Sequence, residues 1–247
     1  MTLAWLDADW PAPANVTAGT TFRSGGVSEG SFTYLNLGAH VGDDSGHVAR
    51  NRRRFREAAG LPAEPVWLNQ VHGIEVLVDP VVTVERQPAD AVVCRTAGKI
   101  AAVLTADCLP VLFASLDDSE VAAAHAGWRG LAAGVLEATV RAMRTQPERL
   151  LAWLGPAISQ QAFEVGAEVR ERFCDLDPNC AQHFAVNERR RWQADLYGLA
   201  RLRLNAVGVN RISGGDRCTF AEKDRFFSYR RDGECGRMCS FVFRNPA

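Results

Sequence analysis

Residues 100–130 read IAAVLTADCLPVLFASLDDSEVAAAHAGWRG, and this segment determines more of the expected architecture than any other. It holds three apolar runs, each too short for an ordinary helix: Ile100–Thr105, Leu109–Ser115 and Glu120–His125. Short, continuous apolar runs of this kind predict strands that are buried on both faces. Asp117 and Asp118 lie between the second and third runs and suit a tight turn, which predicts a β-hairpin.

The predicted hairpin brings Cys108 and His125 together. The midpoint of their positions is 116.5, within about one residue of the turn, so we expect them nearly opposite each other at one end of the ladder. Residues that face each other in such a ladder lie roughly 5 Å apart, and diagonal neighbours roughly 7–8 Å. A thiolate and an imidazole can therefore converge on one metal ion or one substrate.

His72 is the expected third member of this site. It lies in the polar loop Asn69-Gln70-Val71-His72-Gly73, between strands predicted at Val66–Leu68 and Glu75–Val78. Loops at strand ends often carry functional residues. Two His and one Cys with an open fourth position form a known type of catalytic zinc site.

The residue types alone leave other interpretations open. The same set of two His and one Cys binds blue copper when a Met supplies a weak axial ligand, although no Met lies beside the three residues in sequence. Cys108 and His125 also fit a metal-free hydrolase, with the thiol as nucleophile and the imidazole as base. In the simplest interpretation Cys108 is a small buried hydrophobe and His72 a hydrogen-bonding loop residue.

The rest of the sequence mixes helix and strand signals. Predicted helices cover Gly46–Ala59, Leu131–Arg144, Gly166–Phe173 and Asp195–Val207, and further strands cover Thr17–Arg23, Leu151–Leu154, Val209–Ile212 and Cys239–Phe243. Because several strand pairs are expected to be hairpins, we predict a mixed α/β or α+β class rather than a wound parallel sheet. No repeat, low-complexity tract or long linker interrupts the chain, which predicts a single domain over residues 1–247.

The composition excludes several classes of protein. A net charge of −1 over 247 residues argues against general nucleic-acid or membrane-surface binding, since either favours a strongly basic balance. No apolar run approaches the roughly 18 residues of a membrane span, and the N-terminus lacks the features of a signal peptide. The seven cysteines include no Cys-x-x-Cys pair and indicate free thiols in a reducing compartment, so we expect a cytoplasmic protein.

Eight short motifs occur in order along the chain: Ser24-Gly25-Gly26-Val27-Ser28, Leu35-Asn36-Leu37-Gly38, Asn69-Gln70-Val71-His72-Gly73, Thr105-Ala106-Asp107-Cys108-Leu109-Pro110, Ala124-His125-Ala126-Gly127-Trp128-Arg129-Gly130, Gly155-Pro156-Ala157-Ile158, Gly214-Gly215-Asp216-Arg217-Cys218-Thr219 and Phe227-Ser228-Tyr229-Arg230-Arg231-Asp232-Gly233. In this combination they resemble the laccase-domain family, also called the multicopper polyphenol oxidase family, whose bacterial members are named purine nucleoside phosphorylases. The resemblance extends from about Thr20 to Phe243.

The resemblance implies a single domain with a mixed β-sandwich core flanked by helices, like the toxin-type cysteine hydrolase fold. It implies that His72, Cys108 and His125 bind one catalytic zinc per chain. It also implies phosphorolysis of adenosine, inosine and methylthioadenosine to the free base and ribose 1-phosphate, with adenosine deaminase activity in addition. Bacterial members are further linked to peptidoglycan editing, which is a cellular role and does not identify a substrate.

The histidine count bears on the competing names within this family. Going by the enzymes that the family name resembles, a blue-copper centre plus a three-copper cluster needs about ten His ligands. This chain has five His, whereas one zinc site of the proposed type needs two. The His-x-Glu and Pro-Cys-x-x-Cys strings of the usual zinc nucleobase deaminases do not occur, so deamination here needs a different arrangement. A copper-dependent polyphenol oxidase and a Cys-His hydrolase of peptidoglycan precursors stay as alternatives.

Phosphorolysis requires groups that hold phosphate and groups that contact the nucleoside. Guanidinium groups suit phosphate, and the candidates are Arg129, at the start of a predicted helix, Arg23 and Arg230. The candidates for base or ribose are Asn69, Gln70, Asp107 and Glu164, and Asp107 could equally orient a metal ligand. Trp128 and Phe227 could stack on a purine, although aromatic residues of this kind are more often part of the core. His47 and His183 are expected on the surface and His40 has no assigned role. The oligomeric state stays open, with a monomer among the alternatives.

Overall fold

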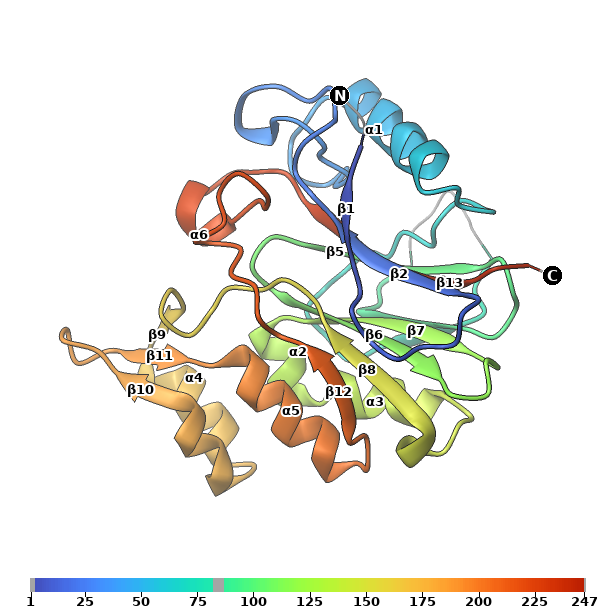
Figure 1. The fold of residues 1–247 in the computed structure, drawn as a ribbon. Coiled ribbons are helices and arrows are strands. Elements are labelled where there is room, and N and C mark those ends of the chain that lie inside the picture. The colour runs from blue at the N-terminus through green and yellow to red at the C-terminus, as the bar shows by residue number, and fades with distance from the viewer. Residues whose placement is uncertain (1–2, 82–86, 247) are drawn as a thin grey trace.

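The computed structural model describes residues 3–81 and 87–246, and two β-sheets form its centre (Figure 1). The larger sheet has six strands in the order β12 (Arg211–Gly214), β8 (Leu150–Leu154), β6 (Leu109–Ser115), β7 (Val121–Ala126), β4 (Ala91–Cys94) and β3 (Val76–Val78). Its two outer pairs, β12 with β8 and β3 with β4, are parallel, and the inner pairs are antiparallel. The antiparallel inner pairs exclude a purely wound parallel sheet, so the predicted mixed α+β class is confirmed.

The smaller sheet joins the two ends of the chain. Its four antiparallel strands follow the order β1 (Trp5–Asp7), β2 (Val16–Thr21), β13 (Met238–Arg244) and β5 (Ile100–Thr105). Side chains of β5 and β13, such as Val103 and Val242, pack against Leu112 and Ala123 of the larger sheet in one apolar cluster. The two sheets therefore form a sandwich.

Helices cover the outer face of each sheet, which explains why the central strands are apolar on both faces (Figure 1). Helix α1 (Ser45–Ala58) covers the smaller sheet, where Phe55 packs against Phe241. Helices α2 (Trp128–Ala133), α3 (Val135–Ala142) and α5 (Leu196–Ala206) cover the larger sheet, with Leu136 and Leu199 in one cluster with Phe113 of β6.

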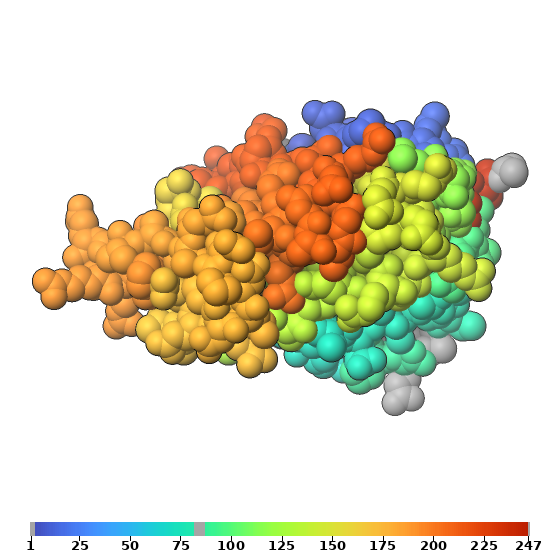
Figure 2. All heavy atoms as spheres, turned by 90° about the horizontal axis from the view of Figure 1, so that it is seen from below, coloured from blue at the N-terminus to red at the C-terminus, as the bar shows by residue number. Residues whose placement is uncertain are grey.

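A third sheet extends from this body beside helix α4 (Ala167–Cys174), as Figures 1 and 2 show. Its strands follow the order β10 (Phe184–Val186), β11 (Trp192–Ala194) and β9 (Glu164–Val165). The remaining short helices are η1 (Gly30–Phe32), η2 (Pro147–Arg149), η3 (Pro178–His183) and α6 (Tyr229–Asp232). In the ranges 3–81 and 87–246, no helix combines the length and the apolar character needed to cross a bilayer.

Three sequence predictions differ from the structure. The helix predicted at Leu131–Arg144 is two helices, because Gly134 adopts φ 104° and ends α2 before α3 begins. The segment Val66–Leu68 is not a strand, and only Val66 forms an isolated bridge, to Ala101. In addition, the sequence predictions omitted β1, the apolar strand β4 and the small third sheet, whose strands are short or carry polar residues.

The third prediction that differs from the structure is the register of the β6–β7 hairpin. Leu109 pairs with Ala126 and Pro110 with His125, so the centre of the turn lies one residue later than predicted. Cys108 therefore precedes the first paired residue of β6 and is not directly opposite His125. The two side chains still meet, because both lie at the same end of the hairpin.

Candidate metal centre

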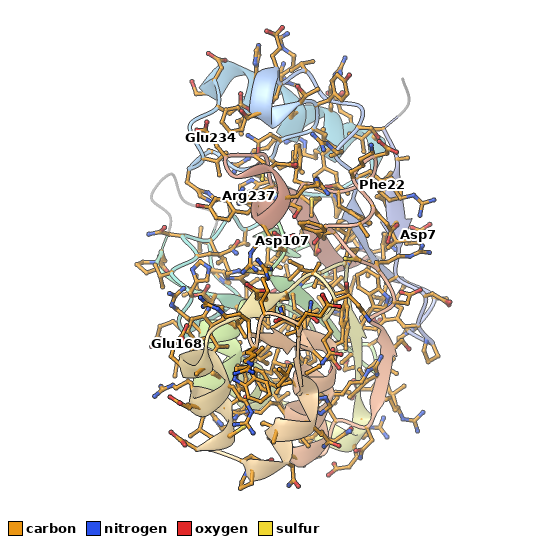
Figure 3. The ribbon with its side chains drawn as sticks, turned by 90° about the vertical axis from the view of Figure 1, so that its left-hand side faces the viewer. Asp7, Phe22, Asp107, Glu168, Glu234 and Arg237 are labelled. Atoms are coloured by element: carbon orange, nitrogen blue, oxygen red, sulfur yellow. The ribbon has the colours of Figure 1, made fainter. Side chains whose placement is uncertain are left out.

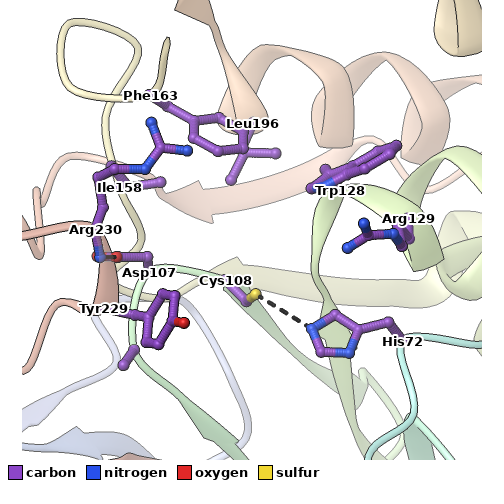
Figure 4. Close-up of a pocket in the computed structure, with 11 residues that line it drawn as sticks. His72, Asp107, Cys108, Trp128, Arg129, Ile158, Phe163, Leu196, Tyr229 and Arg230 are labelled. Carbon is purple, nitrogen blue, oxygen red and sulfur yellow. Dashed lines mark hydrogen bonds between the residues drawn. The ribbon is translucent and has the colours of Figure 1, made fainter. Parts of the chain in front are cut away.

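His72, Cys108 and His125 gather at the open end of the β6–β7 hairpin. One ligand atom from each lies within 4.8 Å of the other two, and no second group of three such side chains occurs among the described residues. Cys108 Sγ lies 4.0 Å from His72 Nε2 (Figure 4). The imidazole rings of His72 and His125 meet edge to face with centroids 4.8 Å apart. His125 is buried, Cys108 half-buried and His72 exposed, so the group opens towards solvent on the His72 side.

Gly127 makes this close approach possible. A Cβ atom at this position would lie 3.0 Å from Cys108 Sγ and 3.0 Å from the Cδ2 atom of His72. Both distances are shorter than an ordinary van der Waals contact, so a side chain here would separate the ligands. The glycine that follows His125 and Ala126 therefore belongs to the site for a steric reason.

The charges within the group favour a thiolate beside an imidazolium when no metal is bound. Burial would raise the pKa of the Cys108 thiol, but the charge and hydrogen bonds of His125 and His72 outweigh it and lower the pKa to about 6. Burial would lower the pKa of His125, but the Cys108 thiolate and Asp90 raise it to about 9. A thiolate and two imidazoles within bonding range of one point can hold a metal ion.

Asp90 connects two of the three residues, and the sequence analysis missed it. This fully buried carboxylate accepts a 2.7 Å hydrogen bond from Nδ1 of His125, which leaves Nε2 to face the site. It also accepts hydrogen bonds from the backbone N–H groups of Val71 (3.2 Å), His72 (3.0 Å) and Gly73 (2.6 Å). These three bonds hold His72 at φ 61°, a left-handed conformation that a histidine adopts at a cost.

Asp107 lies beside the ligands but is occupied by protein donors. Its carboxylate accepts hydrogen bonds from the hydroxyls of Thr219 (2.6 Å) and Ser228 (3.1 Å) and from the backbone N–H of Arg230 (2.7 Å). It thus joins the segment before β6 to two C-terminal motifs. Protein donors thus use three of the roughly four acceptor positions of this carboxylate, and the contact between Asp107 and substrate stays a prediction.

A cavity of about 280 Å³ lies in front of the candidate ligands (Figure 4). We call it the first cavity, and beyond His72 and Cys108 its walls include Trp128, Arg129, Ile158, Phe163, Leu196, Tyr229 and Arg230. The guanidinium of Arg129 lies 4.6 Å from the Trp128 ring centroid, and that of Arg230 lies 5.3 Å from the Phe163 ring. The sequence did not single out Tyr229, whose 61% exposed side chain forms part of this wall.

The other predicted substrate residues lie elsewhere or have protein partners. Arg23 donates to the carbonyl oxygens of Thr33 and Lys223, and Glu164 accepts from Asn187 and Arg189. Asn69 forms a backbone bridge to Pro88, and the Gln70 amide makes two 2.8 Å hydrogen bonds with the backbone of Leu104. None of Arg23, Asn69 and Glu164 lines the first cavity.

The structure also places the two predicted stacking residues and the two histidines predicted on the surface. Trp128 lines the first cavity, whereas Phe227 is fully buried beside Met238 and cannot stack on a ligand without unfolding of its surroundings. His47 lies near Asp43 at the start of α1, and His183 is half-buried beside Asp195. Both imidazoles are half-buried, so the predicted surface position is only partly correct for each of them.

Comparison with known proteins shows what the chain is similar to. The family described as multi-copper polyphenol oxidoreductase laccase matches residues 17–245. The chain is 53% identical over 234 residues to a protein of Escherichia coli named purine nucleoside phosphorylase YfiH, covering 95% of this chain and 96% of that protein. It is 51% identical over 241 residues to the Pseudomonas aeruginosa protein named purine nucleoside phosphorylase PA4543, covering 97% and 98%.

A solved structure shows the same fold. The crystal structure of the Neisseria meningitidis protein NMB0706 is similar with a TM-score of 0.94 and 49% sequence identity, and the match covers 98% of this chain and 99% of that one.

Proposed function

The chain belongs to the family described as multi-copper polyphenol oxidoreductase laccase, and on that premise we propose that it is a metal-dependent purine nucleoside phosphorylase. The observation that best supports this function is the group His72, Cys108 and His125 at the foot of a cavity with aromatic walls. Purine nucleosides and inorganic phosphate are the proposed substrates, because close relatives carry this enzyme name over nearly their full length.

One zinc ion is the proposed cofactor. The Sγ atom of Cys108 and Nε2 of His125 and His72 supply the soft and intermediate donors that zinc prefers. One such ligand group occurs in the part of the chain that the structure describes, which fits one ion per chain. A blue-copper centre with a three-copper cluster needs more ligands than this group provides, so copper oxidation is the less favoured alternative. When bound, zinc supplies a fixed positive charge that attracts a substrate oxygen.

The side chains around the ligands suit the rest of the reaction. Phosphorolysis forms a bond between a phosphate oxygen and C1′ of the ribose and breaks the C1′–N9 bond, whose electron pair leaves with the purine. The apolar side chains of Ile158, Phe163 and Leu196 remove the base from water, and Trp128 presents an aromatic surface to it. Deamination of adenosine at C6 stays a prediction from the resemblance.

The test is a product assay on zinc-loaded protein with adenosine, in the presence and absence of phosphate. Adenine and ribose 1-phosphate should form only when phosphate is present, and inosine would report deamination. Cys108→Ala should lower the rate by at least about 100-fold, because the site loses both its thiolate and bound charge. Cys174→Ala, which changes a half-buried thiol at the end of α4, should leave the rate unchanged.

Other outcomes contradict the proposal in distinct ways. Adenine release without phosphate would indicate a hydrolase. Activity that survives chelation but not thiol alkylation would favour the metal-free Cys-His mechanism, and several coppers per chain with visible absorbance would favour the oxidase.

A further inference from the structure

A second cavity of about 390 Å³ adjoins the first on the other side of the candidate ligands. The two cavities share His72, Ala106, Cys108 and Tyr229, so these four residues form a common wall. The remaining walls of the second cavity include His40, Gln70 and Arg237 instead of Phe163 and Leu196. Figure 3 shows Arg237 on the α1 side of Asp107 and Glu168 on the opposite side, towards α4.

The wall that contains Arg237 is held by the N-terminal loop that follows β2. The Asn36 side chain accepts hydrogen bonds from the backbone N–H groups of Arg237 (2.9 Å) and Gly38 (2.8 Å), and Leu37 N–H donates to the Arg237 carbonyl. A Cβ atom at Gly38 would lie 2.8 Å from Cγ of Arg237. The motif Leu35-Asn36-Leu37-Gly38 therefore fixes the position of Arg237 and leaves room for its side chain, a purpose that the reaction described above does not explain.

The charges of the second cavity favour an anion. The guanidinium of Arg237 supplies a permanent positive charge to its lining, and within the described ranges no Asp or Glu lines it. Nη1 of Arg237 donates to the carbonyl oxygens of Cys235 (2.8 Å) and Gly236 (3.1 Å), which fixes the guanidinium in place. Thr105 also lines this cavity, and its buried hydroxyl has no hydrogen-bond partner among residues 3–81 and 87–246.

The first cavity has a more aromatic lining, although it also contains arginines. Arg237 of the second cavity lies 6.0 Å from the Tyr229 ring centroid, farther than either arginine of the first cavity lies from its ring. The guanidiniums of Arg129 and Arg230 lie over the rings of Trp128 and Phe163, and Arg230 also donates to the carbonyl of Glu164 at 2.7 Å. Stacked guanidiniums extend flat surfaces, which suit a planar base. Asp107 is also among the residues that line this cavity, and its negative charge repels phosphate.

We propose that inorganic phosphate binds in the second cavity, with Arg237 as its principal cationic contact, while the purine occupies the first cavity. The inference rests on the proposed phosphorylase function and assigns each substrate to one cavity. The ribose then lies at the common wall beside Tyr229, and phosphate reaches C1′ from the side opposite the base. The bond to the phosphate oxygen forms there as the C1′–N9 bond breaks, and the base keeps the electron pair.

The test compares two arginine variants against two substrates. Arg237→Gln should raise the KM for phosphate by at least about tenfold, because a charged hydrogen bond to the anion is lost, and change the KM for adenosine by less than about twofold. Arg230→Gln should show the reverse pattern. Arg237→Lys, which keeps the positive charge, should give a KM for phosphate between the wild-type and Arg237→Gln values. A rise in the KM for phosphate in Arg230→Gln but not in Arg237→Gln would overturn the assignment.

A binding measurement separates this inference from the proposed function. Calorimetric titration of inorganic phosphate alone into zinc-loaded protein should show weaker binding to Arg237→Gln than to wild type or to Arg230→Gln. If the wild type turns over no nucleoside, the phosphorylase proposal fails, whereas the location of the anion site is still decided by this titration. Equal phosphate affinity in Arg237→Gln and wild type would refute the role of Arg237, and thermal melting shows that each variant is folded.

Discussion

Asp90 fixes the protonation of His125 as well as its position. Because the carboxylate accepts from Nδ1, the ring carries its proton there and directs an unprotonated Nε2 at the site when the imidazole is neutral. Burial opposes the ionisation of Asp90, but hydrogen bonds from His125 and the backbone of the His72 loop hold its pKa below the ordinary value. One buried charge thus orients two candidate ligands that lie far apart in sequence.

The substitution Asp90→Asn should weaken metal binding. One amide oxygen cannot serve all four hydrogen-bond donors, so the NH2 group of the new amide would face either the His125 ring or the backbone N–H groups of Val71 and Gly73. We expect zinc affinity, measured by competition with a chromogenic chelator, to fall by roughly 10–100-fold. Asp79→Asn is the control, because Asp79 also accepts two backbone hydrogen bonds but lies outside both cavities.

Cobalt substitution gives a second measurement of the Asp90→Asn variant. Loss of His125 as a ligand would change the d–d bands while the sulfur charge-transfer band of Cys108 persists. Unchanged zinc affinity and cobalt spectra would show that Asp90 only stabilises the fold.

At the scale of elements, short segments with sharp ends bring the site together. Helix α2 begins directly after Gly127 and approaches the His72 loop closely, since a Cβ atom at Gly130 would lie 2.9 Å from the carbonyl oxygen of Gly73. Helix α3 leaves in a new direction at Gly134, where the backbone N–H bonds the carbonyl of Gly130 at 2.9 Å. Because of this break, α2 packs beside the His72 loop while α3 packs against the larger sheet.

Gly134→Ala should therefore destabilise the protein. An L-residue at φ 104° costs about 1–2 kcal/mol, which corresponds to a decrease in Tm of about 2–8 °C for a chain of this size. Gly134→Asn should lose less stability, because Asn adopts left-handed conformations more readily than Ala does. Thermal melting checks both variants. A larger loss for Asn than for Ala would show that space, rather than backbone conformation, requires glycine here.

At the scale of the whole molecule, the chain termini close the sandwich. Strand β13 lies between β2 and β5, so the C-terminal residues complete the sheet that the N-terminal residues begin. We propose that residues 1–247 form one domain, and we expect one cooperative unfolding transition for metal-free protein. Far-UV circular dichroism and the fluorescence of Trp5 and Trp153, which report on different sheets, should give coincident denaturation curves. Two separated transitions would divide the chain into two units.

Zinc should stabilise this fold through its ligands. A ligand that binds only the folded state at 100 times its Kd adds about 2.7 kcal/mol to the free energy of unfolding. The Tm of the wild type and of Cys174→Ala should rise on addition of zinc, and the Tm of Cys108→Ala should stay near its metal-free value. An equal rise in Cys108→Ala would place the metal elsewhere.

The sequence by itself determined the mixed fold class, most of the central strands and three candidate ligands. Short apolar runs indicate burial, and the hairpin between residues 109 and 126 joins neighbours in sequence. Cys108 and His125 were therefore predictable as a pair, with the centre of the turn one residue from its predicted position and the register shifted by two residues. His72 was predicted from its residue type and from its position in a polar loop.

Only the tertiary structure decided which neighbours serve the site. Asp90 lies 35 residues from His125, and Asp107 lies 112 residues from Thr219, so no local pattern marks either contact. Arg23 and Glu164 carry suitable charges but direct them at protein partners, whereas Arg237 reaches a cavity wall through a loop at the other end of the chain. Residue type fixes what a side chain can bind, but the long-range packing of the sandwich fixes what it meets.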